Sequence, residues 1–274
     1  MRLVFLGTAG GRRVTFYQLR ASGGILVEGG GALVHLDPGP GALVRLVEAG
    51  EDPAKLDMIL VTHRHLDHSA DLNTLVESRT MGGWTKGGKV VAPRDVMEGE
   101  DPVLLRYHRK NLNGVEVLEE EWHTSVNGLT IKTAMRHPHH GVETYGVVLE
   151  SEGIRVGYLT DGRYRPEMGE AYKDCHLLIA STTFFYPRDM DHLSVPEVIE
   201  IVKVARPKQV VLTHFSMEML DEGPKRAAEV VERETGVPTT AALDLHELVF
   251  EEEPGLFGWR KTKAARPSME TGEI

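Results

Sequence analysis

The sequence predicts an α/β (α+β) fold in which strands and helices pack in layers within one domain. Short apolar runs bounded by glycine recur along the chain, and stretches with helical periodicity lie between some of them. Neither an internal repeat nor a linker-like low-complexity stretch divides the 274 residues, a length that one large domain can accommodate. We therefore expect one domain over residues 1–253, followed by a polar tail over 254–274.

The first third of the chain contains four apolar runs of the length expected for strands. They are Leu3–Leu6, Ile25–Glu28, Ala32–Leu36 and Met58–Thr62. A short helix is expected over Ala42–Ala49, because its apolar residues share one face and Gly50 follows as a stop signal. Asp67–Ser78 also has its leucines and valine on one face, so the residues just before it lie at a junction between a strand and a helix.

The rest of the chain continues the mixed pattern. Helices are expected over Val195–Ala205 and near Pro224–Thr235. Further strands are expected at Lys89–Ala92, Val115–Leu118, Leu129–Ala134, Tyr145–Glu150, Arg155–Thr160, Leu177–Ser181, Gln209–Thr213 and near Leu248–Glu251.

The composition places the chain among globular proteins. Hydrophobic residues make up 41% and charged residues 26%, which excludes a disordered or fibrous chain. No apolar run approaches the roughly 18 residues of a membrane-spanning helix. The formal net charge of −10 disfavours capture of long nucleic acid. Cys175 is the single cysteine, so an internal disulfide is impossible and a cytoplasmic location is expected.

Six of the thirteen histidines gather in two short stretches, 63–68 and 137–140. The stretch from His63 to His68 has the form H-x-H-x-D-H, which would occur by chance about 0.001 times in a chain of this composition. His63 and His65 leave a strand end, where alternate residues point the same way, whereas Asp67 and His68 diverge at the start of a helix. Two ligand pairs can therefore serve two metal ions, because neutral imidazole and carboxylate are common metal ligands.

Further ligands are available where later strands end. His137, His139 and His140 lie close together, and spacing alone does not choose among them. Asp161 ends an apolar run, and its two carboxylate oxygens can each bind one of two cations. His214 follows the apolar run 210–213 in the same manner.

These motifs resemble those of the metallo-β-lactamase fold hydrolases, in the same order along the chain. Asp37 resembles the first motif, His63–His68 the second, His140 the third, Asp161 the fourth and His214 the fifth. The resemblance covers Met1 to about Glu251. It implies a single-domain four-layer αββα sandwich that binds two divalent metal ions, most commonly zinc, with manganese or iron as alternatives.

The resemblance also implies a role for each residue. One metal would be held by His63, His65 and His140, and the other by Asp67, His68 and His214. Asp161 would bridge the two metals, and Asp37 would fix the ligand loop without touching them. Asp67 would also orient or deprotonate the attacking water, and His192 would protonate the leaving oxygen.

Within the superfamily, the stretch from His140 to Gly146 resembles the third motif of ribonuclease Z and of the phosphonate-pathway cyclic phosphodiesterase. This likeness selects His140 over His137 and His139. Only 21 positions separate His140 from Asp161, which leaves no room for the tRNA-binding arm of ribonuclease Z. Ser181 stands where ribonuclease Z has an acidic residue, and Cys175 alone cannot supply the additional zinc site of the cyclic phosphodiesterase.

The resemblance therefore implies a phosphodiesterase that acts on a small or exposed phosphodiester, of the cyclic or short nucleotide type. Three alternatives stay open: a lactone or thioester hydrolase with the same metals, a tRNA 3′-processing endonuclease, which the missing arm disfavours, and a non-catalytic metal-binding protein. The same resemblance implies a homodimer, and no membrane partner is expected.

Overall fold

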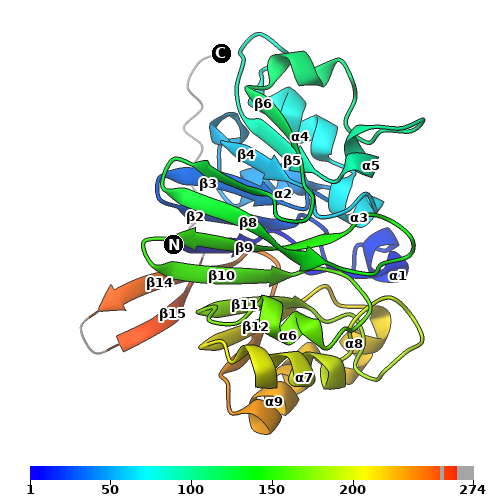
Figure 1. Ribbon diagram of the computed structural model, residues 1–274, viewed down its shortest axis with the longest axis vertical. Coiled ribbons are helices and arrows are strands. Elements are labelled where there is room, and N and C mark those ends of the chain that lie inside the picture. The colour runs from blue at the N-terminus through cyan, green and yellow to red at the C-terminus, as the bar shows by residue number, and fades with distance from the viewer. Residues whose placement is uncertain (254–255, 264–274) are drawn as a thin grey trace.

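The computed structural model describes residues 1–253 and 256–263, and its centre is a pair of mixed β-sheets (Figure 1). The first sheet has eight strands in the order β15-β14-β1-β2-β3-β4-β5-β6. They are β1 (Arg2–Phe5), β2 (Ile25–Gly29), β3 (Ala32–Leu36), β4 (Met58–Leu60), β5 (Lys89–Ala92), β6 (Gly114–Val117), β14 (His246–Glu253) and β15 (Leu256–Lys263). The strands from β3 to β6 run parallel.

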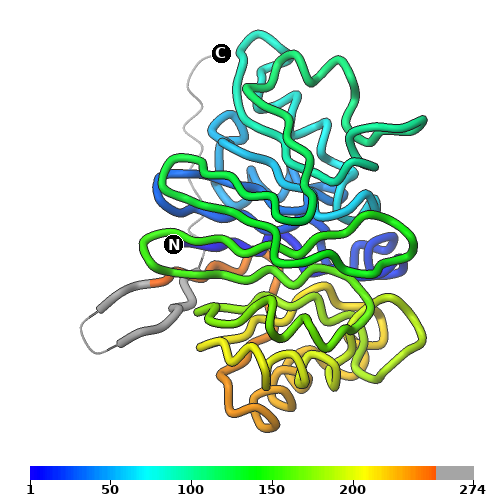
Figure 2. Tube along the Cα trace, viewed as in Figure 1, coloured from blue at the N-terminus to red at the C-terminus, as the bar shows by residue number. Residues whose placement is uncertain are grey.

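The second sheet has seven strands in the order β13-β12-β11-β10-β9-β8-β7. They are β7 (His123–Val126), β8 (Leu129–Arg136), β9 (Tyr145–Ser151), β10 (Ile154–Leu159), β11 (Leu177–Ser181), β12 (Gln209–Thr213) and β13 (Thr239–Ala241). The strands from β10 to β13 run parallel. After this sheet the chain returns to the first one, where β14 pairs antiparallel with β1 (Figure 2).

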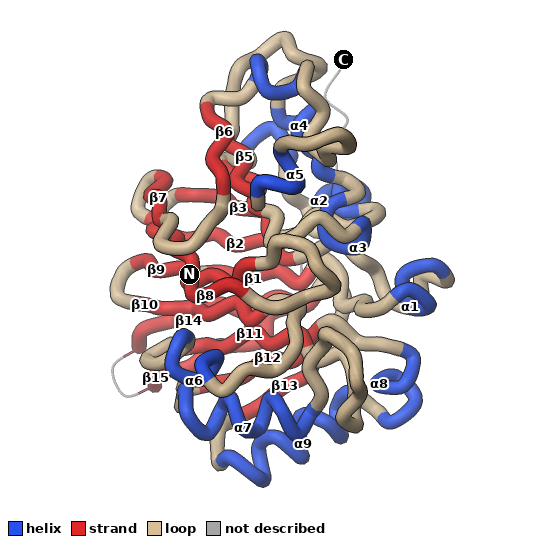
Figure 3. Tube along the Cα trace, turned by 45° about the vertical axis from the view of Figure 1, so that its right-hand side comes forward, coloured by secondary structure: helices blue, strands red, loops and turns tan. Residues whose placement is uncertain are grey.

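Helices cover the outer face of each sheet (Figure 3). Against the first sheet lie α2 (Ala42–Glu48), α4 (Leu72–Arg79) and α5 (Arg94–Met97), and against the second lie α6 (Glu167–Ala171), α7 (Val195–Ala205), α8 (Met217–Glu222) and α9 (Pro224–Thr235). The shorter elements are α1 (Arg12–Phe16), α3 (Leu66–Ser69) and two 3₁₀ turns, Pro53–Lys55 and His108–Asn111.

Successive side chains along each strand point to opposite faces of the sheet, and the apolar ones form three clusters between the layers. In β1, Leu3 and Phe5 face the cluster between the two sheets, whereas Val4 faces the helices. In β11, Leu177 and Ile179 face the other sheet, and the residue between them packs toward α7 and α9. The four predicted layers, αββα, are therefore present.

The helix predicted over Asp67–Ser78 is divided into α3 and α4. The backbone N–H of Asp71 donates to the carbonyl of Pro38, at 3.0 Å, instead of continuing the helical ladder. The carboxylate of Asp71 also accepts a hydrogen bond from the backbone N–H of Leu43. Tertiary contacts with the 38–43 segment thus interrupt a continuous helical pattern at this point. The sequence pattern also did not predict the short elements α1, α5, α6, α8, β7 and β13.

Residues 256–263 fall within the segment predicted to be a polar tail, and they form β15, which pairs antiparallel with β14. The rest of that segment, 254–255 and 264–274, lies outside the described residues. Across the described part of the chain, no helix is long and apolar enough to cross a membrane. Cys175 is buried and carries a free thiol.

Candidate metal centre

The residues singled out in the sequence come together at one edge of the two sheets. They lie on loops that follow β3, β4, β10 and β12, in the short helix α3, and on loops that precede β9 and α7. The backbone N–H of Tyr145 donates to the carbonyl of Thr62, at 3.1 Å, and so joins the two sheets at this edge. Five overlapping groups of histidine and aspartate side chains there have ligand atoms within 4.8 Å of one another.

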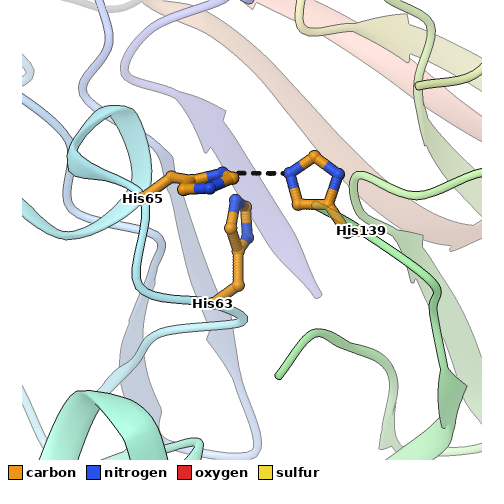
Figure 4. Close-up of side chains that lie close together, drawn as sticks. All are labelled: His63, His65 and His139. Carbon is orange, nitrogen blue, oxygen red and sulfur yellow. Dashed lines mark hydrogen bonds between the residues drawn. The ribbon is translucent and has the colours of Figure 1, made fainter. Parts of the chain in front are cut away.

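His63, His65 and His139 form the first group, and their rings converge (Figure 4). Nδ1 of His65 lies 3.0 Å from Nε2 of His139. The Thr62 hydroxyl donates its proton to the Asp37 carboxylate, so it accepts a hydrogen bond from Nδ1 of His63. This leaves Nε2 of His63 unprotonated and turned toward the other two rings.

The third member of this group differs from the sequence-based choice of His140. His139 is buried, and its Nδ1–H donates to the Asp191 carbonyl at 2.7 Å, which leaves Nε2 unprotonated toward His65. His140 is exposed and has a left-handed backbone with φ of 44°, at the turn that continues into Gly141. The turn carries the His140 ring to the rim, within reach of His139 and His192 but outside the group formed with His63 and His65.

Asp67, His68 and His214 form the second group. Nε2 of His68 lies 3.1 Å from Nε2 of His214, and Oδ2 of Asp67 lies 3.6 Å from the same His214 atom. All three residues belong to the set predicted for a second metal.

Asp161 lies between the two groups. Its Oδ2 is 3.4 Å from Nε2 of His68 and 3.8 Å from Nε2 of His139. Because one carboxylate faces a nitrogen from each group, this placement suits the bridging role that the resemblance implies.

The donor set fits divalent metal ions. Nε2 of His63 is buried and has no hydrogen-bond partner in the structure, and such an orphaned polar atom costs about 1–3 kcal/mol unless something binds it. Imidazole nitrogen and carboxylate oxygen, converging from two sides, are the ligand types that zinc takes in proteins. The centre therefore has the chemistry of a site for divalent metal ions.

The second layer of the centre is built around Asp37. Its carboxylate accepts hydrogen bonds from the backbone N–H and the hydroxyl of Thr62, at 2.7 and 2.8 Å, and from the Tyr158 hydroxyl at 2.9 Å. Oδ2 also lies 2.9 Å from Nδ1 of His68. Asp37 thus holds the ligand loop and points Nε2 of His68 into the centre.

Burial and charge set the protonation of these groups. Burial lowers the pKa of His63 well below its usual value and lowers the pKa of His139 to about 4. Burial also acts to lower the pKa of His68, but the Asp37 and Asp161 carboxylates outweigh it and raise this pKa well above its usual value. His68 must therefore lose a proton before its Nε2 can bind a metal.

His192 lies beside the centre, at the start of α7. Its Nδ1 is 3.4 Å from Oδ2 of Asp161 and 3.3 Å from the Thr183 hydroxyl. Thr183 also lies 3.0 Å from Nδ1 of His214. Burial lowers the pKa of His192 to about 4, so its ring is neutral in the free protein.

His137 is not turned toward the ligand groups. Its Nδ1 lies 3.0 Å from the backbone carbonyl of Asp161, and its Nε2 lies 3.1 Å from the Tyr172 hydroxyl. It therefore supports the backbone of Asp161 from behind. The sequence did not single out Tyr158, which lies in β10, or Tyr172, which directly follows α6, because an aromatic side chain at such a position usually signals the core.

Comparison with known proteins agrees with this geometry. A family model described as the beta-lactamase superfamily domain matches residues 33–215, more than half of the chain. The chain belongs to the metallo-beta-lactamase superfamily. Among its relatives, ribonuclease Z of Pyrobaculum calidifontis is 30% identical over 271 residues, which cover 84% of this chain and 92% of that protein.

Solved structures confirm the metallo-beta-lactamase fold. The metallo-beta-lactamase fold protein YhfI of Bacillus subtilis matches with a TM-score of 0.76 at 20% identity, over 90% of this chain and 98% of that chain. A diphosphatase of the PhnP family matches with a TM-score of 0.68 at 21% identity, over 91% of this chain and 98% of that chain. The chain is accordingly a metallo-hydrolase of this superfamily.

Proposed function

We propose that this metallo-hydrolase is a phosphodiesterase that works with two divalent metal ions, most commonly zinc. One ion would be held by His63, His65 and His139. The other would be held by Asp67, His68 and His214, with Asp161 bridging the two. When bound, such a pair of ions supplies positive charge against the phosphate and activates a water molecule for attack.

The position of His192 is the observation that favours phosphodiester hydrolysis over the other reactions. Neither ligand group needs this imidazole, yet it lies 3.4 Å from the carboxylate that the two groups share. A neutral ring takes up a proton when an anionic phosphate approaches, and it can then give that proton to the departing alkoxide oxygen. Hydrolysis of a phosphodiester whose leaving group is an alkoxide requires such a donor, because an alkoxide is a poor leaving group.

Asp67 would act on the attacking water, whereas His192 would act on the leaving group. Burial tends to raise the pKa of Asp67, but the hydrogen bond from His214 and the nearby His68 and His214 rings together outweigh burial, so the pKa is lowered and the carboxylate stays ionised. An ionised carboxylate next to the centre can orient the attacking water and accept its proton.

The relatives support hydrolysis at phosphorus, since one is named ribonuclease Z, for a phosphodiester polymer, and a structural neighbour is titled a diphosphatase, for the related phosphoanhydride bond. The short connection from His139 to Asp161 supports a small or exposed substrate. It is taken up by β9 and β10, which pair as an antiparallel hairpin. We therefore propose a cyclic or short nucleotide type of phosphodiester, and a long nucleic acid is disfavoured.

The buried free thiol of Cys175 supports a cytoplasmic location, and a homodimer stays a prediction.

A substrate panel tests this proposal against the alternatives. The metal-loaded protein would be given bis-p-nitrophenyl phosphate, a lactone and a thioester, with the Asp67→Ala variant as the comparison. Turnover of the phosphodiester that the variant loses is the expected result. Preferential turnover of the lactone or thioester would contradict the proposal, and metal binding without any turnover would favour a binding role.

A further inference from the structure

The segment that carries His192 is a loop held at three places. Its base, at Phe184 and Leu193, is closed by a backbone hydrogen bond of 3.1 Å. On its outer limb, Arg188 and the backbone N–H of Tyr186 both donate to the carboxylate of Glu218. On its inner limb, next to His192, Asp191 accepts a hydrogen bond from Nε of Arg163 at 2.6 Å. We call residues 185–193 the donor loop.

Arg163 connects this loop with two other segments of the centre. It follows Asp161 by two positions, so its backbone is joined closely along the chain to the residue that carries the bridging carboxylate. Its backbone N–H donates to the carbonyl of Pro138 at 2.8 Å, in the segment that carries His139. Its guanidinium spans two carboxylates of the donor loop, Asp191 through Nε and Asp189 through both terminal nitrogens at 3.0 Å.

Asp191 links Arg163 to the segment that carries His139 and His140. Its Oδ2 accepts a hydrogen bond of 2.7 Å from the backbone N–H of His140. Its backbone carbonyl accepts Nδ1–H of His139 at 2.7 Å, which fixes the tautomer that leaves Nε2 of His139 unprotonated. The ring of His139 and the backbone of His192 therefore both depend on where Asp191 lies.

We propose that Arg163 is a positioning residue, which sets the orientation of His139 and His192 relative to Asp161 through Asp191. This inference rests on the proposed function, because it assigns His139 to a metal and His192 to the proton transfer. Arginine suits the task because its planar fork can bind two carboxylates at once, which a lysine ammonium does not reproduce. Without this cation, Asp189 and Asp191 would repel each other across the donor loop.

The role differs from that of an ordinary stabilising ion pair. The Arg163 side chain is 48% exposed, and those of Asp189 and Asp191 are 94% and 22% exposed. Ion pairs made by so exposed an arginine contribute little to stability. Removing the guanidinium should therefore leave the melting temperature almost unchanged. It should instead alter the ligand geometry and the turnover number, because small misplacements of reacting groups slow catalysis strongly.

The test compares Arg163→Ala and Arg163→Lys with Arg188→Ala. Arg188 is a matched control because it is an exposed arginine on the same donor loop, and its partner Glu218 does not contact the ligands. Two readouts are recorded: the visible absorption spectrum of the cobalt-substituted protein, which reports coordination geometry, and kcat and KM for a 2′,3′-cyclic nucleotide, whose alkoxide leaving group needs a proton.

We expect Arg163→Ala to change the cobalt spectrum and to lower kcat about tenfold or more, with a smaller change in KM. Arg163→Lys should recover part of both, and Arg188→Ala should match the wild type. The inference is overturned if Arg163→Ala matches the wild type, or if Arg188→Ala shows the same changes, since loosening of the loop would then suffice. A wild-type protein that binds cobalt without hydrolysing the diester would contradict the proposed function alone, because the spectra still decide the role of Arg163.

Discussion

Oδ2 of Asp37 lies 2.9 Å from Nδ1 of His68, and both side chains are buried at the junction of the two sheets. Asp37 follows β3 and His68 belongs to α3, so this contact joins the first and second motifs of the centre. Because Nδ1 faces the carboxylate, Nε2 of His68 is the nitrogen directed at His214. The orientation of His68, a member of the second ligand group, thus depends on a carboxylate that lies outside that group.

Asp37→Asn should weaken metal binding without removing a ligand. The amide keeps the shape of the side chain but lacks the charge that orients and polarises His68, and loss of such a partner typically costs 10- to 100-fold in metal affinity. Competition with a chromophoric zinc chelator measures the effect. Tyr158→Phe is the control, because it removes one hydrogen bond to Asp37 and leaves the contact with His68 in place. Equal zinc affinity in wild type and Asp37→Asn would refute this role.

His139→Ala and His140→Ala should differ sharply in metal content. His139 points its unprotonated Nε2 at His65, whereas His140 sits exposed on the turn. Elemental analysis of the purified variants should therefore show about one metal lost from His139→Ala and none lost from His140→Ala. The reverse pattern would restore the ligand set that the sequence resemblance implies.

Zinc binding to the metal-free protein should release a proton from His68. Its pKa is raised by Asp37 and Asp161 against the effect of burial, so the ring is protonated at pH 7 until a metal takes Nε2. Titration calorimetry in buffers of different ionisation enthalpy counts the protons released. Asp37→Asn, which lowers the pKa of His68, should release fewer, and an unchanged count would show that His68 is not the source.

Stability should fall as the pH drops from about 6.5 to about 4. Burial lowers the pKa of His35 and of His137 to about 4, so in this window the unfolded chain binds more protons than the folded one. Each shift corresponds to about 3 kcal/mol of stability that is present above pH 6.5 and lost by pH 4. Urea unfolding across this range should give a shallower pH dependence for His35→Leu, and parallel curves would contradict the assignment.

Much of the fold could be predicted because its signals are local. α7, α9, β11 and β12 match the predicted ranges residue for residue, since each has a clear apolar period and a stop signal. α3 and α4 could not be separated, because the break depends on the contact of Asp71 with Pro38, which no local pattern contains. β7 and β13 were missed because three or four residues give too short a period.

The centre was predictable to the extent that its residues follow strand ends. Asp37 and His214 come directly after a strand, Asp161 follows the end of β10 by two positions, and the H-x-H-x-D-H motif places four more residues at the same edge. The third histidine could not be chosen from spacing. Its identity depends on the left-handed turn at His140 and on the carbonyl of Asp191, which lies 52 residues further along the chain than His139.

The most direct test of the central claim is the turnover of a 2′,3′-cyclic nucleotide by the wild type and by His192→Ala, with metal content measured in both. An alkoxide leaving group needs a proton, so we expect kcat to fall by about 100-fold while metal content stays the same. Bis-p-nitrophenyl phosphate, whose leaving group needs no proton, should show a much smaller loss. Equal turnover of the cyclic nucleotide by the two proteins, or its absence in the metal-loaded wild type, would contradict the account.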